Sequence, residues 1–162
     1  MKRLRISLLA IAALAVVLSL VTSPSKSNRS RDPLLPGGQI DPQVLAILEK
    51  ACQNCHSERT TYPWYSYIAP VSWFIESDVS RGRAHLNLSR WNEYSRVRQE
   101  RSLSEIANQV KDRDMPLWSY TMMHREARLS DSEVAALFRW TQTERSRLIE
   151  ESLRLQESSK PR

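Results

Sequence analysis

The sequence predicts an all-α protein in which one helical domain follows an N-terminal apolar helix. No segment shows the alternation of apolar and polar residues that marks a half-buried strand, and no internal repeat is present. Apolar residues instead recur at helical spacing, and capping signals precede several of these segments. The length of 162 residues fits a single domain with appendages at its ends.

The N-terminal segment is predicted to be a signal peptide or a membrane anchor, covering residues 1–23. Residues 6–21 are an uninterrupted run of apolar and small residues, and Lys2, Arg3 and Arg5 precede it. Basic residues ahead of an apolar run are typical of export signals and anchors. No small-x-small cleavage site stands out, which favours an uncleaved anchor. The rest of the chain is then expected on the periplasmic side of the inner membrane, or soluble in the periplasm if the segment is cleaved.

A flexible linker is predicted over residues 24–40, because Ser, Pro, Gly and charged residues replace the apolar pattern. The folded domain is expected over residues 41–157, followed by a frayed tail at 158–162. Asp41 can cap a helix whose first residue is Pro42. Five residues of this helix then share one face: Val44, Leu45, Leu48, Ala51 and Cys52.

The middle of the chain is interrupted by prolines, so its elements are expected to be short. Residues 59–73 are predicted to form a packed aromatic loop, followed by a short helix through Arg81 that stops at Gly82. A further helix is expected after Ser89, carrying Trp91 and Tyr94.

Two capping boxes predict the last two helices. Ser102 with Glu105, and Ser130 with Glu133, have the spacing at which side chains satisfy free backbone N–H groups. The first helix should end just before Met115 and Pro116. The second should be the longest of the domain, with these residues towards the core: Val134, Leu137, Phe138 and Trp140.

One motif carries the chemistry: Cys52-Gln53-Asn54-Cys55-His56. In C-x-x-C-H, two thiols can add to the vinyl groups of one haem while the adjacent imidazole ligates its iron. We therefore expect one covalent haem c, with Cys52 and Cys55 as anchors and His56 as proximal ligand. A thioredoxin-like dithiol, a structural zinc site and an ordinary disulfide are the alternatives.

The sixth iron ligand must come from elsewhere in the chain, and Met115 is the first candidate. Pro116 prevents continuation of the preceding helix and holds the methionine in a loop. A thioether that merely fills the core is the alternative for this residue. Three nearby residues compete as ligands: Met122, Met123 and His124.

Residues that support the haem are less well indicated by the sequence. The second ring nitrogen of His56 needs a carbonyl partner, for which the backbone near Pro70 or Pro63 is a candidate. Haem propionates need cations or hydrogen-bond donors. The candidates, which plain packing explains equally well, are Arg81, Arg83, Tyr65, Trp64 and Trp73.

Net charge gives no reason to expect a nucleic-acid partner. The chain holds 24 Lys and Arg residues against 18 Asp and Glu. Without Lys2, Arg3 and Arg5, 21 basic residues remain, so the exported part has a net charge of +3. No pattern of catalytic acid, base or nucleophile accompanies the C-x-x-C-H motif, which favours an electron carrier over an enzyme.

Several segments resemble known haem proteins. Residues 44–56 are similar to the first helix of class I cytochromes c, and Met115-Pro116 with residues 137–140 are similar to their ligand loop and last helix. The C-x-x-C-H-S motif and the segments 62–66 and 69–73 resemble a bacterial haem-binding domain family. This resemblance implies haem attachment and a redox or haem-linked role without a defined substrate.

We therefore expect a membrane-tethered monohaem c-type cytochrome that passes single electrons to and from redox proteins, with the inner membrane as a further partner. A haem-based enzyme or sensor of the peroxidase type, with an open distal site, is the alternative. A structural module that contacts a partner through the charged segment 143–154 is a third possibility.

Overall fold

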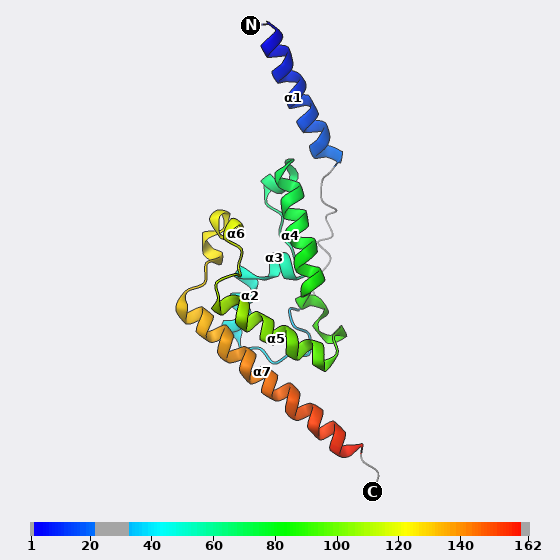
Figure 1. The fold of residues 1–162 in the computed structure, drawn as a ribbon, viewed down its shortest axis with the longest axis vertical. Coiled ribbons are helices and arrows are strands. Elements are labelled where there is room, and N and C mark those ends of the chain that lie inside the picture. Colours follow the sequence, from blue (N-terminus) through cyan, green and yellow to red (C-terminus); the bar gives the residue numbers. More distant parts are fainter. Residues whose placement is uncertain (1, 22–32, 160–162) are drawn as a thin grey trace.

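The computed structural model describes residues 2–21 and 33–159, with side chains for 2–18 and 33–159. Every element in these ranges is helical, which confirms the all-α prediction (Figure 1). The predicted linker from 24 to 32, both ends of the 1–23 segment and residues 160–162 of the predicted tail lie outside the described residues. The elements are α1 (Lys2–Val21), α2 (Pro42–Ala51), α3 (Gln53–His56), η1 (Trp64–Tyr67), α4 (Val71–His85), η2 (Leu88–Glu93), α5 (Arg96–Lys111), α6 (Trp118–Met123), η3 (Arg125–Ala127) and α7 (Asp131–Ser158).

Helix α1 contains the apolar run and the basic residues ahead of it. In the part of the chain whose side chains the structure describes, none of the helices has both the length and the apolar character that a bilayer span needs.

The core lies where α5 runs alongside α7 and α2 packs against α7 (Figure 1). Leu48 of α2, Leu103 of α5 and Leu137 of α7 are completely or almost completely buried, and Trp91 of η2 joins the same cluster. Burial of a large apolar side chain contributes about 1.5–3 kcal/mol. Helical spacing places Leu48, Leu103 and Leu137 on the buried faces of their helices, as the sequence pattern predicts. The prediction that Phe138 faces the core is wrong, because this side chain of α7 is 39% exposed.

Two of the three predicted caps are confirmed. Asp41 accepts a hydrogen bond from the Gln43 backbone N–H at 2.7 Å, and Ser130 forms a reciprocal capping box with Glu133 at the start of α7. The box predicted at Ser102 is wrong, because α5 begins about two turns earlier and is capped by Ser95. Ser102 is buried inside that helix.

The end of the predicted linker packs on the domain. Leu34 and Leu35 are buried in the core, and the Leu35 N–H donates to the Leu88 carbonyl at 2.9 Å. The Gln39 N–H donates to the buried carboxylate of Glu144 at 3.2 Å. The packed domain therefore starts at about residue 33 and not at Asp41, because the side chains of Leu34 and Leu35 are buried in the core.

Helix α4 differs from the prediction at its C-terminus. It does not stop at Gly82 but continues to His85. Glycine is disfavoured inside helices by about 1 kcal/mol, and here a close helix contact explains its presence. The helix expected after Ser89 is the short 3₁₀ segment η2.

Candidate functional site

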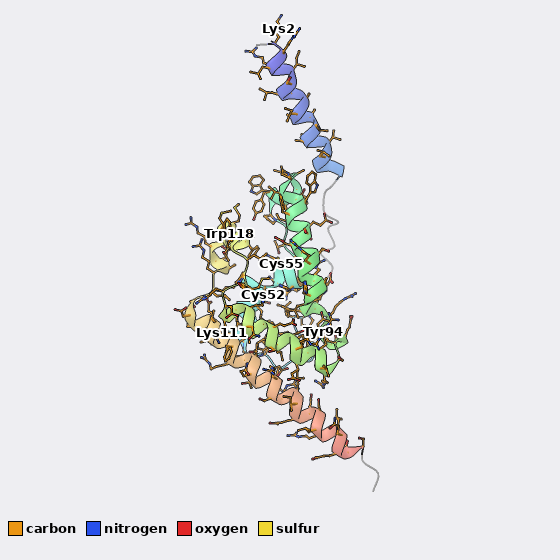
Figure 2. All side chains as sticks on the ribbon, viewed as in Figure 1. Lys2, Cys52, Cys55, Tyr94, Lys111 and Trp118 are labelled. Atoms are coloured by element: carbon orange, nitrogen blue, oxygen red, sulfur yellow. The ribbon has the colours of Figure 1, made fainter. Side chains whose placement is uncertain are left out.

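The C-x-x-C-H motif forms one helical turn at the junction of α2 and α3. Cys52 follows the last residue of α2, and both the Cys55 and His56 N–H groups donate to the Cys52 carbonyl, at 3.3 and 2.9 Å. Figure 2 shows the two cysteines at the centre of the domain. The turn thus presents two sulfurs and an imidazole within five residues.

Both cysteines are free thiols that are partly buried. Burial, and next the neighbouring Cys55, raise the pKa of Cys52 to about 12. Burial and the carboxylate of Asp78 raise the pKa of Cys55 to about 11, against an opposing effect of Arg83. A thioredoxin-like dithiol needs the opposite, a thiol whose pKa is lowered to give a reactive thiolate. The raised pKa values of both thiols therefore disfavour that alternative.

The His56 ring is oriented by a backbone carbonyl. Its Nδ1–H donates to the Leu86 carbonyl at 3.1 Å, which leaves Nε2 as the nitrogen that can ligate a metal. Burial lowers the pKa of His56 and so favours the neutral, ligating form. The expectation of a carbonyl near Pro70 or Pro63 is wrong, because the C-terminal turn of α4 passes closer to the ring.

Gly82 lets α4 reach the C-x-x-C-H turn. A Cβ atom at Gly82 would lie 2.6 Å from the Cys55 carbonyl oxygen and 3.2 Å from the Cys55 Cβ. These distances are too short for any side chain, so only glycine permits this approach. It brings the Leu86 carbonyl, one turn further along, to His56.

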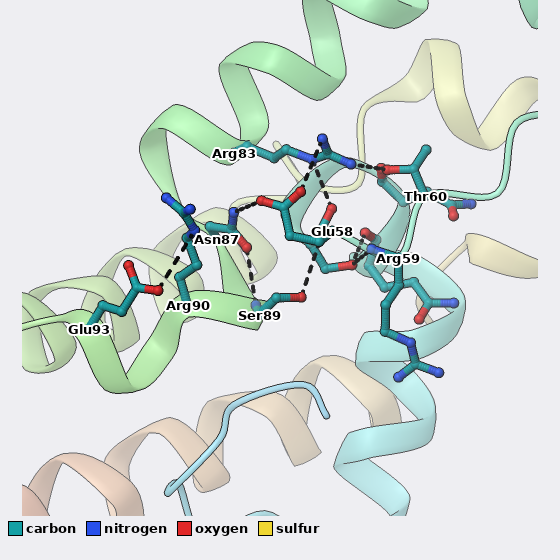
Figure 3. Close-up of polar contacts among 11 residues, drawn as sticks. Glu58, Arg59, Thr60, Arg83, Asn87, Ser89, Arg90 and Glu93 are labelled. Atoms are coloured by element: carbon teal, nitrogen blue, oxygen red, sulfur yellow. Dashed lines mark hydrogen bonds and ion pairs between the residues drawn. The ribbon is translucent and has the colours of Figure 1, made fainter. Parts of the chain in front are cut away.

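Arg83 ties the end of α4 to the segment that follows the motif (Figure 3). Its guanidinium donates to the Ser57 carbonyl at 2.9 Å and to Thr60 Oγ1 at 2.8 Å, and pairs with Glu58 at 3.4 Å. Three contacts of one guanidinium hold this segment in place. Arg83 was a candidate propionate ligand, and the structure gives it this bracing role.

Glu58 is also held from the other side, by the residues that lead into η2 (Figure 3). The Asn87 side-chain amide donates to Glu58 Oε1 at 2.7 Å, and the Glu58 N–H donates to Ser89 Oγ at 3.1 Å. The two turns that flank His56 and Leu86 are therefore connected by side-chain hydrogen bonds as well as by packing.

On the opposite side, α6 contacts the motif through Asn54. The Asn54 amide donates to the Tyr120 hydroxyl at 2.8 Å, and the Tyr120 ring stacks on His124 with centroids 4.5 Å apart. His124 Nε2 accepts from the Tyr65 hydroxyl at 2.8 Å, and its Nδ1–H donates to Glu126 at 3.1 Å. Because both ring nitrogens have partners, this arrangement disfavours His124 as an iron ligand.

Met115 lies in the connection between α5 and α6, where it is half-buried and its N–H donates to the Gln109 carbonyl at 3.2 Å. Its peptide bond to Pro116 is cis. Met122 and Met123 are exposed on α6. The choice of a sixth ligand among these methionines stays a prediction.

The remaining propionate candidates stay predictions too. Arg81 donates to the carboxylate of Asp78, and Tyr65 contacts His124. Trp64 and Trp73 are exposed. Among residues 2–18 and 33–159, no three His, Cys, Asp or Glu side chains lie together in a way that could hold a metal ion, so the zinc alternative has no ligand group there.

Large apolar side chains are exposed on η1 and on the two helices that flank α3. Helix α3 contacts α4 on one side, and Asn54 links it to α6 on the other (Figure 1). The exposed residues are Trp64 and Ile68 of η1 and the turn after it, Val71, Trp73 and Phe74 of α4, and Trp118, Met122 and Met123 of α6. Exposed apolar clusters of this kind mark surfaces that bind a partner or a ligand.

Comparison with known proteins identifies the family. The sequence profile of the haem-binding domain family matches residues 12–143, so the chain belongs to this family. It is also 25% identical over 126 residues to the cytochrome c peroxidase Ccp of Escherichia coli K12, an alignment that covers 75% of this chain. The chain spans only 27% of the length of that relative. Comparison with solved structures gave no significant match.

The residues at α3 fit a haem. Two free thiols share one turn with an imidazole whose Nδ1 is bonded to the Leu86 carbonyl, so that Nε2 is the nitrogen that can ligate iron, and large apolar side chains are exposed on α4 and α6. The sequence alone did not reveal Gly82 or Leu86. A glycine inside a helical pattern was the one available signal, since such a residue often marks a close packing contact.

Proposed function

We propose that this haem-binding protein is a c-type cytochrome that carries one covalent haem and transfers single electrons. Cys52 and Cys55 are the thioether anchors and His56 is the proximal ligand. The observation that carries this proposal is the His56 Nδ1 bond to the Leu86 carbonyl, which orients the imidazole beside both thiols. A bound haem would supply the one-electron chemistry of its iron.

The chain's own residues then orient and shield the group. Gly82 and Arg83 hold α4 against the anchoring turn, and the Leu86 carbonyl increases the basicity of His56 as a ligand. On this proposal, the exposed apolar side chains on α4 and α6 would exclude water from a bound haem and so tune its redox potential. None of these roles requires a catalytic acid or base.

The covalent attachment can be tested by protein mass. Protein matured in the periplasm of a host competent for c-type cytochromes should carry the mass of one haem that survives acid-acetone extraction. Cys52→Ala and Cys55→Ala should each leave a single thioether, with a shifted pyridine haemochrome band. Full loss of haem on extraction of the wild-type protein would reject covalent attachment.

Met115 is proposed as the distal ligand, because Pro116 holds it in the connection between two helices. Met115→Ala should replace the low-spin ferric spectrum by a high-spin one, whereas Met122→Ala and Met123→Ala should leave it unchanged. An unchanged spectrum of Met115→Ala would remove this residue from the site.

We propose that the N-terminal segment tethers the domain to the outer face of the inner membrane. Support comes from Lys2, Arg3 and Arg5 ahead of the apolar run at 6–21. Cell fractionation with an alkaline carbonate wash, together with the mass of the mature N-terminus, distinguishes an anchor from a cleaved signal. Redox proteins of the same compartment would be the electron donors and acceptors.

A peroxidase-like activity is the second candidate, because the matched relative is named a cytochrome c peroxidase. Such an enzyme needs an open distal position. The electron-carrier proposal expects slow cyanide binding by the ferric protein and no turnover of hydrogen peroxide. Fast binding together with peroxide turnover would favour the second candidate.

A further inference from the structure

Helix α6 is weakly packed for a segment beside a cofactor site. It has six residues, none of them buried, and packs mainly against η3, which directly follows it. Trp118 at its start is 74% exposed and Met123 at its end is 57% exposed. Apolar packing therefore does little to determine where α6 lies relative to α3.

Two side-chain hydrogen bonds supply the missing restraint. The Asn54 amide donates to the Tyr120 hydroxyl at 2.8 Å, and the Tyr65 hydroxyl donates to His124 Nε2 at 2.8 Å. The stacked rings of Tyr120 and His124 join the two bonds into one continuous chain. This chain links the C-x-x-C-H turn, α6 and η1.

Asn54 is a rigid point of attachment. Its Oδ1 accepts from the Thr61 N–H at 3.0 Å, and its backbone carbonyl accepts from Thr60 Oγ1 at 2.6 Å. Rotation of the Asn54 side chain would break the bonds to both Thr61 and Tyr120. The amide is thereby held in one orientation, and Tyr120 is bonded to a residue that lies between the two cysteines in the sequence.

We infer that Asn54, Tyr65, Tyr120 and His124 are positioning residues that hold the segment 115–124 over the C-x-x-C-H turn. This segment contains Met115, Met122 and Met123, so its placement would determine how firmly one of these sulfurs can ligate the iron of a bound haem. The inference rests on the proposed c-type function. It assigns the four residues no contact with the iron.

Removal of one link should make the distal face more accessible. Tyr120→Phe and Tyr65→Phe each delete one hydrogen bond, and the expected result is about threefold to tenfold faster cyanide binding by the ferric holoprotein. The low-spin absorption should decrease in parallel. The matched control is Ser152→Ala, which deletes the bond that the Ser152 hydroxyl donates to the Leu148 carbonyl at 2.8 Å on α7, away from α6 and the C-x-x-C-H turn. This control should leave the cyanide rate unchanged.

A conservative rescue separates positioning from a loss of stability. Asn54→Leu should accelerate cyanide binding as Tyr120→Phe does, while in Asn54→Asp the carboxylate can accept from the Tyr120 hydroxyl and should retain most of the wild-type rate. Melting temperature and haem content are measured for each variant. Rates that follow the melting temperature, or that stay at the wild-type value in all α6 variants, overturn the inference. A wild-type chain without haem would instead reject the proposed function.

Discussion

Gly82→Ala tests the closest contact in the site. The added methyl carbon would lie 2.6 Å from the Cys55 carbonyl oxygen, whereas ordinary van der Waals contact begins at 3.4 Å. The difference, 3.4 − 2.6 = 0.8 Å, is the distance by which α4 or α3 must yield. The two nearest atoms, the carbonyl oxygen and carbonyl carbon of Cys55, belong to the backbone of the anchoring turn and not to a flexible side chain.

The expected loss of stability has two parts. Overpacking against backbone should cost about 2–3 kcal/mol, the upper part of the usual range. Alanine in place of glycine inside a helix returns about 0.5–1 kcal/mol. The net decrease in the free energy of unfolding is therefore about 1–2.5 kcal/mol, which corresponds to a melting temperature lower by about 2–10 °C.

The assay is thermal and urea unfolding, with Ser80→Ala as the matched control. Ser80 is exposed on the same helix, so this change should alter stability by no more than about 0.5 kcal/mol. Haem content should decrease in Gly82→Ala, because the shift separates the Leu86 carbonyl from His56. If Gly82→Ala matches or exceeds the wild-type stability, α4 does not press against Cys55 and the account of this glycine is refuted.

Three further predictions follow from the structure. Arg83→Ala should lower the free energy of unfolding in urea by about 1–3 kcal/mol through its lost hydrogen bonds, while Arg81→Ala, exposed on the same helix, should change it by less than about 0.5 kcal/mol. Leu34→Ala should lower the free energy of unfolding by about 2–4 kcal/mol if the segment before α2 belongs to the core. Leu155→Ala, on the exposed end of α7, should change it little, and equal effects of the two substitutions would contradict this prediction. The haem-free chain should lose stability as the pH rises from 9 to about 12, because the unfolded thiols, with an ordinary pKa of 9.0, release protons before the folded thiols with pKa values of about 11 and about 12. Thioether formation removes these thiols, so alkaline unfolding curves of the haem-loaded and haem-free forms should diverge in this range.

The sequence predicted those parts of the fold that depend on short segments. Asp41 and Ser130 begin their helices as expected, because each cap satisfies N–H groups within three residues. The similar signal at Ser102 failed, since the preceding residues 96–101 are largely charged and conceal the start of α5. Gln99 is buried there through a bond to the Trp91 carbonyl at 2.9 Å, a contact that helical periodicity does not predict.

For the candidate site, too, the sequence predicts local geometry but not the contacts between distant residues. Cys52, Cys55 and His56 follow from the motif itself, because their relative positions are set within one turn. The hydrogen-bond partner of His56 could not be predicted from the sequence, because Leu86 lies 30 residues further along the chain and a backbone carbonyl has no sequence signature. The same holds for Asn54 and Tyr120, which are 66 residues apart.

The last turn of α4 connects stability to ligation. Gly82 contacts the anchoring turn, Arg83 binds the segment after it, and the Leu86 carbonyl orients His56. Since these three residues lie within five positions, fraying of this turn removes all three restraints at once. In the proposed c-type form, loss of these restraints would free the imidazole to rotate while the two thioethers still held the haem. Partial unfolding at the C-terminus of α4 should therefore release the proximal ligand before the domain unfolds, and the spectrum of a haem that has lost its histidine should appear at lower urea concentration than the loss of helix.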